Sequence, residues 1–211
     1  MKKKFDTYGS TILPAVSELT QLQIDTVALW HQQPIENTYD GYKKLVCAQH
    51  ECNYRLWHEE DAARSPSATD EEIANVKRAI DKLNQARNDM IEKIDDALTE
   101  VLSEAGIQAT DCTPANTETP GNAIDRLSIM SLRLYHYREQ HQRQDADAEH
   151  QAKVAERITL CEQQHTDLSQ SLQQLLNDIF AGTKQHKTYR QMKMYNDPSL
   201  NPAIYQAGEK Q

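Results

Sequence analysis

The side chains best suited to chemistry lie in three segments of the chain. Glu60 and Arg64 are four residues apart, so they share one face of a helix. Arg87 stands among apolar residues in the second segment. Asp125 and His136 stand among apolar residues in the third. A buried charge without a partner is strongly destabilising. We therefore expect these acids and bases to meet one another, or a ligand, between the helices.

One chemistry that fits these residues is the binding or turnover of a small anionic, for example phosphorylated, ligand. Arginine binds carboxylate and phosphate groups through paired N–H groups, while glutamate and histidine serve as acid or base. The catalytic candidates are Glu60, His136 and Asp125. The ligand-binding candidates are Arg64, Arg87, Arg126, Asn53, Asp81, Arg190 and Lys193. The same groups also fit an ion-pair network that only fixes the register of the helices.

A second chemistry is a metal site. His58-x-x-Asp61 and His136-x-x-Glu139 each place a nitrogen and an oxygen on neighbouring helical turns, as metal sites in helical bundles do. The metal candidates are His58, Asp61 and Glu139. However, His58 and Asp61 lie away from the centre of the apolar face of their helix, which disfavours a shared metal centre.

An enzymatic form of the metal site would be a metal-dependent hydrolase of the all-α nucleotide pyrophosphohydrolase type. Such enzymes hold Mg²⁺ through clustered carboxylates on paired helices. Only Glu92-x-x-Asp95 matches this pattern, and it matches by spacing alone. The sequence identifies no cofactor.

A non-enzymatic function is also compatible with the sequence. Two apolar seams, from Ile73 to Val101 and from Val154 to Ile179, are longer than a compact domain needs. They would allow the chain to pack against a second copy as a dimeric interaction module, whose polar interior only sets register.

Long helices must position all of these residues. The chain has only six Gly and two Phe among many Gln, Asp, Glu, Ala and Leu residues, which favours helix over strand. The sequence predicts helices over residues 14–33, 39–64, 69–106 and 120–142, and a fifth that ends before Gly182. The third begins at a capping box, Thr69 with Glu72, and ends at Gly106. The fourth is apolar nearly all round, which marks it as the central helix.

These helices should pack into an antiparallel bundle, because the third has apolar residues at alternating steps of three and four. Arg87 interrupts that seam. We expect an all-α bundle of about five long, mainly antiparallel helices over residues 1–182. Residues 183–211 should form an irregular C-terminal tail that packs on the bundle, with Arg190 or Lys193 pairing with helix acids or closing over an anion.

Composition narrows the function classes. A net charge of −9 argues against general nucleic-acid binding, which relies on Lys and Arg clusters. No apolar run approaches the roughly 20 residues that span a bilayer, so we expect no membrane span and a cytoplasmic location. The four cysteines lack CxxC spacing, which predicts reduced thiols.

Four ordered motifs resemble one known family. They are YRLWHEEDAAR at 54–64, KRAIDKLNQARND at 77–89, NTETPGNAIDRLSI at 116–129 and YRQMKMYNDP at 189–198. The chain is similar to the bacterial family called domain of unknown function 4254. The resemblance implies a helical cytoplasmic protein and supplies no established substrate or cofactor. The positions that match the family motifs are His58, Glu60, Asp61, Arg64, Asp81, Asp125, Arg126, His136 and Glu139.

Overall fold

The computed structural model describes residues 13–110, 112–188, 190 and 199–200. These residues contain five helices and no strand. The helices are α1 (Val16–Trp30), α2 (Gly41–Ala63), α3 (Asp70–Glu104), α4 (Pro120–His141) and α5 (Ala148–Phe180). The all-α prediction is confirmed, and each helix boundary lies within a few residues of the predicted one.

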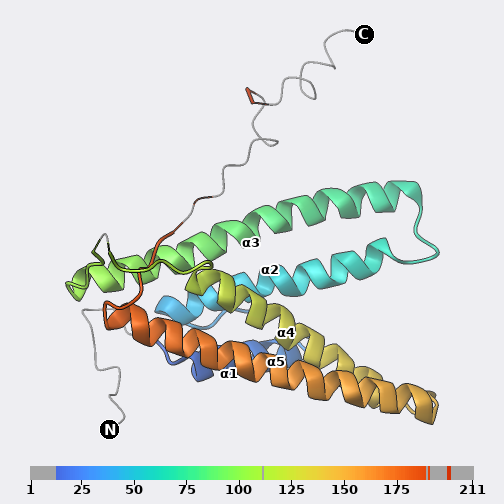
Figure 1. Cartoon of the computed structure of the whole chain (residues 1–211). Coiled ribbons are helices and arrows are strands. Elements are labelled where there is room, and N and C mark those ends of the chain that lie inside the picture. Colours follow the sequence, from blue (N-terminus) through green and yellow to red (C-terminus); the bar gives the residue numbers. More distant parts are fainter. Residues whose placement is uncertain (1–12, 111, 189, 191–198, 201–211) are drawn as a thin grey trace.

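Two helical hairpins make up most of the molecule. Helices α2 and α3 form one and α4 and α5 the other, and the hairpins diverge toward the loops that join their helices (Figure 1). Helix α1 packs against α2, α4 and α5. Helix α4 contacts each of the other four helices, as its nearly continuous apolar surface predicts.

The predicted end signals of α3 are present. Thr69 Oγ1 accepts the backbone N–H of Glu72 at 3.3 Å, and the Glu72 carboxylate accepts the backbone N–H of Thr69 at 2.7 Å. At the other end Gly106 has a φ of +67°, and the N–H of Ile107 donates to the carbonyl of Leu102 at 2.9 Å. This is the Schellman arrangement that glycine favours after a helix.

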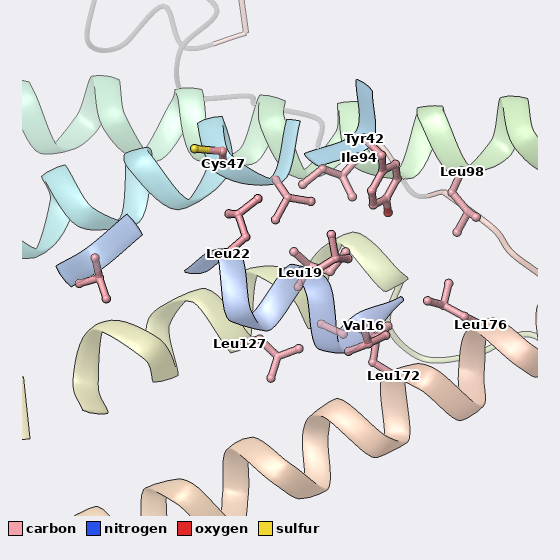
Figure 2. Close-up of a cluster of buried hydrophobic side chains, with 14 of the residues drawn as sticks. Val16, Leu19, Leu22, Tyr42, Cys47, Ile94, Leu98, Leu127, Leu172 and Leu176 are labelled. Carbon is pink, nitrogen blue, oxygen red and sulfur yellow. The ribbon is translucent and has the colours of Figure 1, made fainter. Parts of the chain in front are cut away.

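The main core lies where α1 meets both hairpins. Figure 2 shows Leu19 and Leu22 of α1 among Ile94 of α3, Leu127 of α4 and Leu172 of α5. Only the second half of α3, from Ile91 onward, contributes buried residues. The predicted seam is therefore incomplete, and Ile73 near the start of α3 is 43% exposed.

A close crossing of α3 and α4 fixes the central helix. Asp95 is 2% exposed, and its Oδ1 accepts the backbone N–H of Gly121 at 2.8 Å. A Cβ at Gly121 would stand 2.8 Å from the Ile91 carbonyl oxygen and 2.8 Å from Asp95 Oδ2. Glycine at this position therefore allows the two helices to approach.

Replacing Gly121 with alanine should lower the free energy of unfolding by about 1–3 kcal/mol, because the added methyl group forces the helices apart. A loss of stability would point to the close crossing, because replacing glycine with alanine inside a helix normally raises stability by about 1 kcal/mol. Urea unfolding measures the difference. An alanine variant as stable as the parent would contradict the close crossing.

Gln185 and Arg190 of the tail contact earlier parts of the chain. The N–H of Gln185 donates to the carbonyl of Pro114 at 3.0 Å, and Arg190 donates to Glu92 at 3.0 Å and to Asp96 at 2.6 Å. Lys193 lies outside the described residues, and the division of the chain at residue 182 remains a prediction.

All four cysteines are free thiols. Among the described residues, no helix has the length and apolar character needed to cross a bilayer.

Candidate functional site

Asp125 on α4 is the centre of a buried polar network. It is 4% exposed. Its Oδ1 accepts N–H groups from Gln49 at 2.6 Å and from Asn53 at 2.9 Å, both on α2. Asn53 also donates to Ser128 Oγ at 2.9 Å, and Ser128 lies 2.7 Å from Nδ1 of His50. The network therefore links α2 and α4, although Gln49 Oε1 and His50 Nε2 are buried without a hydrogen-bond partner among the described residues.

Arg87 brings α3 into this network. Its Nε–H donates to Asp125 Oδ1 at 2.7 Å, and its Nη2 donates to Oδ2, which makes a bidentate ion pair. These hydrogen bonds raise the pKa of Arg87, against the effect of burial. The sequence prediction that inward-facing charges from different helices meet is thus fulfilled for this pair. Two N–H groups on Nη1 and one on Nη2 take no part in it.

A pocket of about 320 Å³ opens beside Arg87, between α2, α3 and α4. Its apolar lining consists of Leu56, Trp57, Ile129 and Leu132. Its polar lining consists of Asn53, Glu60, Asp61, Arg64, Asn84 and Arg87. The volume is at the lower end of the range for small-molecule sites, and the mixture of an apolar wall with a few polar groups is typical of them.

Arg64 stands at the end of α2, where it is exposed and weakly held. Its Nη2 donates to Glu60 at 2.9 Å, and its Nη1 lies 3.7 Å from Asp61. Its side chain is 67% exposed. Because exposed ion pairs contribute little stability, Arg64 can exchange these partners for a ligand at small cost.

Three histidines from three helices form a second cluster next to this pocket. They are His31 at the end of α1, His58 on α2 and His136 on α4. Each offers one ring nitrogen, and these three nitrogens lie within 4.8 Å of one another. Trp57 connects the two places, since it lines the pocket and stacks on His136 with ring centroids 4.7 Å apart.

The structure places most of the sequence-predicted residues in the buried network, in the pocket or in the histidine cluster. Asn53, Arg87 and Asp125 belong to the buried network, and Glu60, Asp61 and Arg64 line the outer part of the pocket. His58 and His136 belong to the histidine cluster. Glu139 lies behind it, with Oε2 2.7 Å from Nδ1 of His136. The three catalytic candidates are therefore not gathered in one place.

The remaining candidates lie elsewhere. Asp81 is exposed and pairs with Lys77, and Arg126 pairs with Glu118 at 3.0 Å. Arg190 forms ion pairs with Glu92 and Asp96 of α3. Glu92 and Asp95, which match the hydrolase spacing, pair with Arg190 and with the N–H of Gly121.

The comparison with family models agrees with the motifs in the sequence. The model for the protein of unknown function family DUF4254 matches residues 43–188, more than half of the chain. The chain belongs to this family. The matched range covers the buried network, the pocket and two of the three clustered histidines. No curated protein and no solved structure is a significant match to the chain.

Sequence reasoning did not find His31 or Asn84 as site residues. His31 follows Trp30 at the end of α1, and it lacks a partner residue at metal-ligand spacing. Asn84 lies one turn before Arg87 on the same helix face, a spacing that would have placed it beside any ligand of Arg87.

Proposed function

We propose that the pocket between α2, α3 and α4 binds a small molecule that carries an anionic group on an apolar or aromatic body. The position of Arg87 is the main support for this proposal. Asp125 fixes its guanidinium through two hydrogen bonds, while Arg87 lines an open pocket and keeps three N–H groups for a ligand.

Asp125 acts in this proposal as a positioning residue. It already accepts four N–H groups, from Gln49, Asn53 and twice from Arg87. Three of these hydrogen bonds are to Oδ1 and one is to Oδ2, so the carboxylate is engaged with side chains of both α2 and α3. It holds Arg87 in place, which reduces the side-chain entropy that Arg87 would lose when a ligand binds.

Arg64 supplies the second positive charge. A ligand anion that reaches it from the pocket competes only with the exposed carboxylates of Glu60 and Asp61. These two acids also limit the negative charge that the ligand can carry, because they would repel a highly charged anion. A single carboxylate or phosphate group, with an aromatic body against Trp57, fits the lining best.

Calorimetric titration tests the proposal with adenosine monophosphate and benzoate as probes, and with adenosine and benzamide as their uncharged analogues. At least one anion should bind more tightly than its analogue. Replacing Arg64 with methionine should weaken that binding about 10-fold or more, since a charge-assisted hydrogen bond contributes about 1.5–3 kcal/mol. Fluorescence of Trp57 gives an independent signal from inside the pocket.

Arg126→Met is the matched control, because the Arg126 side chain is similarly exposed, at 57%, and forms its ion pair, with Glu118, outside this pocket. It should leave the affinity unchanged. Native mass spectrometry of protein taken directly from cells should also show a retained small molecule. If no probe binds and the native protein carries nothing, the proposal is wrong.

A second candidate, a dimeric interaction module, is supported by the first half of α3. Ile73 is exposed, and Val76, Ile80 and Leu83 are only partly buried. A second copy packed here would cover this apolar stripe. The same native mass spectra would give the mass of the assembly.

A further inference from the structure

The histidine cluster holds ring nitrogens that the protein itself leaves unsatisfied. The Nε2 atoms of His31, His58 and His136 are buried and have no hydrogen-bond partner among the described residues. A buried polar atom without a partner costs about 1–3 kcal/mol. Other histidines also have a buried ring nitrogen without a partner. Within the described part of the chain, however, only His31, His58 and His136 each bring a ring nitrogen within 4.8 Å of the other two.

The hydrogen bonds of the other ring nitrogens determine which atom is free to bind. Nδ1 of His31 lies 2.7 Å from the carbonyl oxygen of Val27, which can only accept, so Nδ1 carries the proton. Nδ1 of His136 likewise donates to the Glu139 carboxylate at 2.7 Å. In the neutral ring each Nε2 then holds a lone pair. This is the tautomer in which histidine binds a metal ion, with the outer N–H held by a carbonyl or a carboxylate.

Burial favours the neutral form of His58. It lowers the pKa of His58, and the nearby His31 and His136 lower that pKa further. The rings are also held in place by aromatic neighbours, since His31 stacks on Tyr135 with centroids 4.2 Å apart and His136 stacks on Trp57. Three imidazoles from separate helices, with their ring nitrogens close together, are a ligand set suited to Zn²⁺ or a similar ion.

We propose that His31, His58 and His136 bind one divalent transition-metal ion, for which Zn²⁺ is the probe. Nitrogens at about 2.0–2.1 Å from a tetrahedral Zn²⁺ lie about 3.3 Å from one another. The present separation of up to 4.8 Å would therefore have to shorten by about 1.5 Å when the ion binds. Three protein ligands leave a fourth position for water or another small ligand.

This site differs from the one that the sequence spacing predicts. His31 from α1 replaces Asp61, which faces Arg64 instead, and Glu139 orients His136 and is not itself a ligand. The proposal does not depend on anion binding in the neighbouring pocket. The two can be tested apart because their key residues differ.

Zinc competition with a chromophoric chelator, using the full chain after treatment with EDTA, tests this site. We expect one Zn²⁺ per chain, and Co²⁺ should give visible absorption without the near-ultraviolet thiolate bands of a cysteine site. His58→Gln and His136→Gln should each weaken binding by about 100-fold or more, and Glu139→Gln by about 10-fold, as the loss of an outer partner typically does.

His165→Gln is the matched control, because His165 is also partly buried with an unpartnered Nε2 but lies outside the cluster. It should bind Zn²⁺ as the parent does. Circular dichroism checks that each variant is helical, and Glu139→Gln leaves all three ligands in place if a histidine variant fails to fold. Absence of stoichiometric binding, unchanged binding in a folded His58→Gln variant, or thiolate bands with Co²⁺ would each overturn the proposal.

Discussion

An Asp125→Ala variant is expected to lose about 3–5 kcal/mol of unfolding free energy, the range for breaking a buried ion pair from one side. The loss arises because Arg87, whose side chain is only 26% exposed, then keeps its charge without a counterion. Gln49 and Asn53 lose the acceptor for one N–H each. Urea unfolding, followed by circular dichroism, measures the change.

Two further variants separate the ion pair from simple loss of a side chain. Asp81→Ala removes an aspartate from an exposed pair with Lys77 and should change stability by no more than about 0.5 kcal/mol. Combining Asp125→Leu with Arg87→Met should recover part of the loss, because neither charge then remains unpaired. If Asp125→Ala is no more harmful than Asp81→Ala, the network does not hold the three helices together.

Arg87 shows how far the sequence alone predicts this site. It interrupts an apolar seam, and Asp125 stands in a helix that is apolar nearly all round. Each position by itself indicates an inward-facing charge that needs a partner. Helical periodicity is enough for this inference, and the structure brings the two residues together.

His31 is a site residue that helical periodicity does not predict. Its proximity to His58 and His136 depends on how α1 and α4 pack on α2, which no period within one helix encodes. Spacing along single helices favoured Asp61 and Glu139 instead. Local patterns therefore predict the neighbours on one helix, while a site built from three helices appears only in the tertiary structure.

The first half of α3 shows that the burial of a helix face also depends on tertiary packing. Its apolar residues follow the spacing of a packed seam, and the helix forms as predicted. Whether that seam is covered depends on what lies opposite it. Because the two hairpins diverge (Figure 1), residues such as Ile73 remain exposed although their spacing is correct.

Acid should destabilise the protein through His50. This side chain is fully buried between Ser128 and the ring of Trp30, and burial lowers its pKa from 6.5 to about 3. Below pH 6.5 the unfolded chain binds a proton here and the folded chain does not. Stability is therefore fully present above pH 6.5 and falls toward pH 3, by up to about 1.4 kcal/mol for each pH unit.

Because other groups also titrate in this interval, the test is a difference between variants. His50→Leu lowers stability at neutral pH, since it loses the bond to Ser128. Its stability should nevertheless decline less steeply with acid than that of the parent, as the buried proton acceptor is gone. His141→Leu, a change at an exposed histidine, should keep the parent's slope. Equal slopes in the parent and in His50→Leu would mean that His50 can be protonated in the folded protein, and would contradict its burial as a neutral ring.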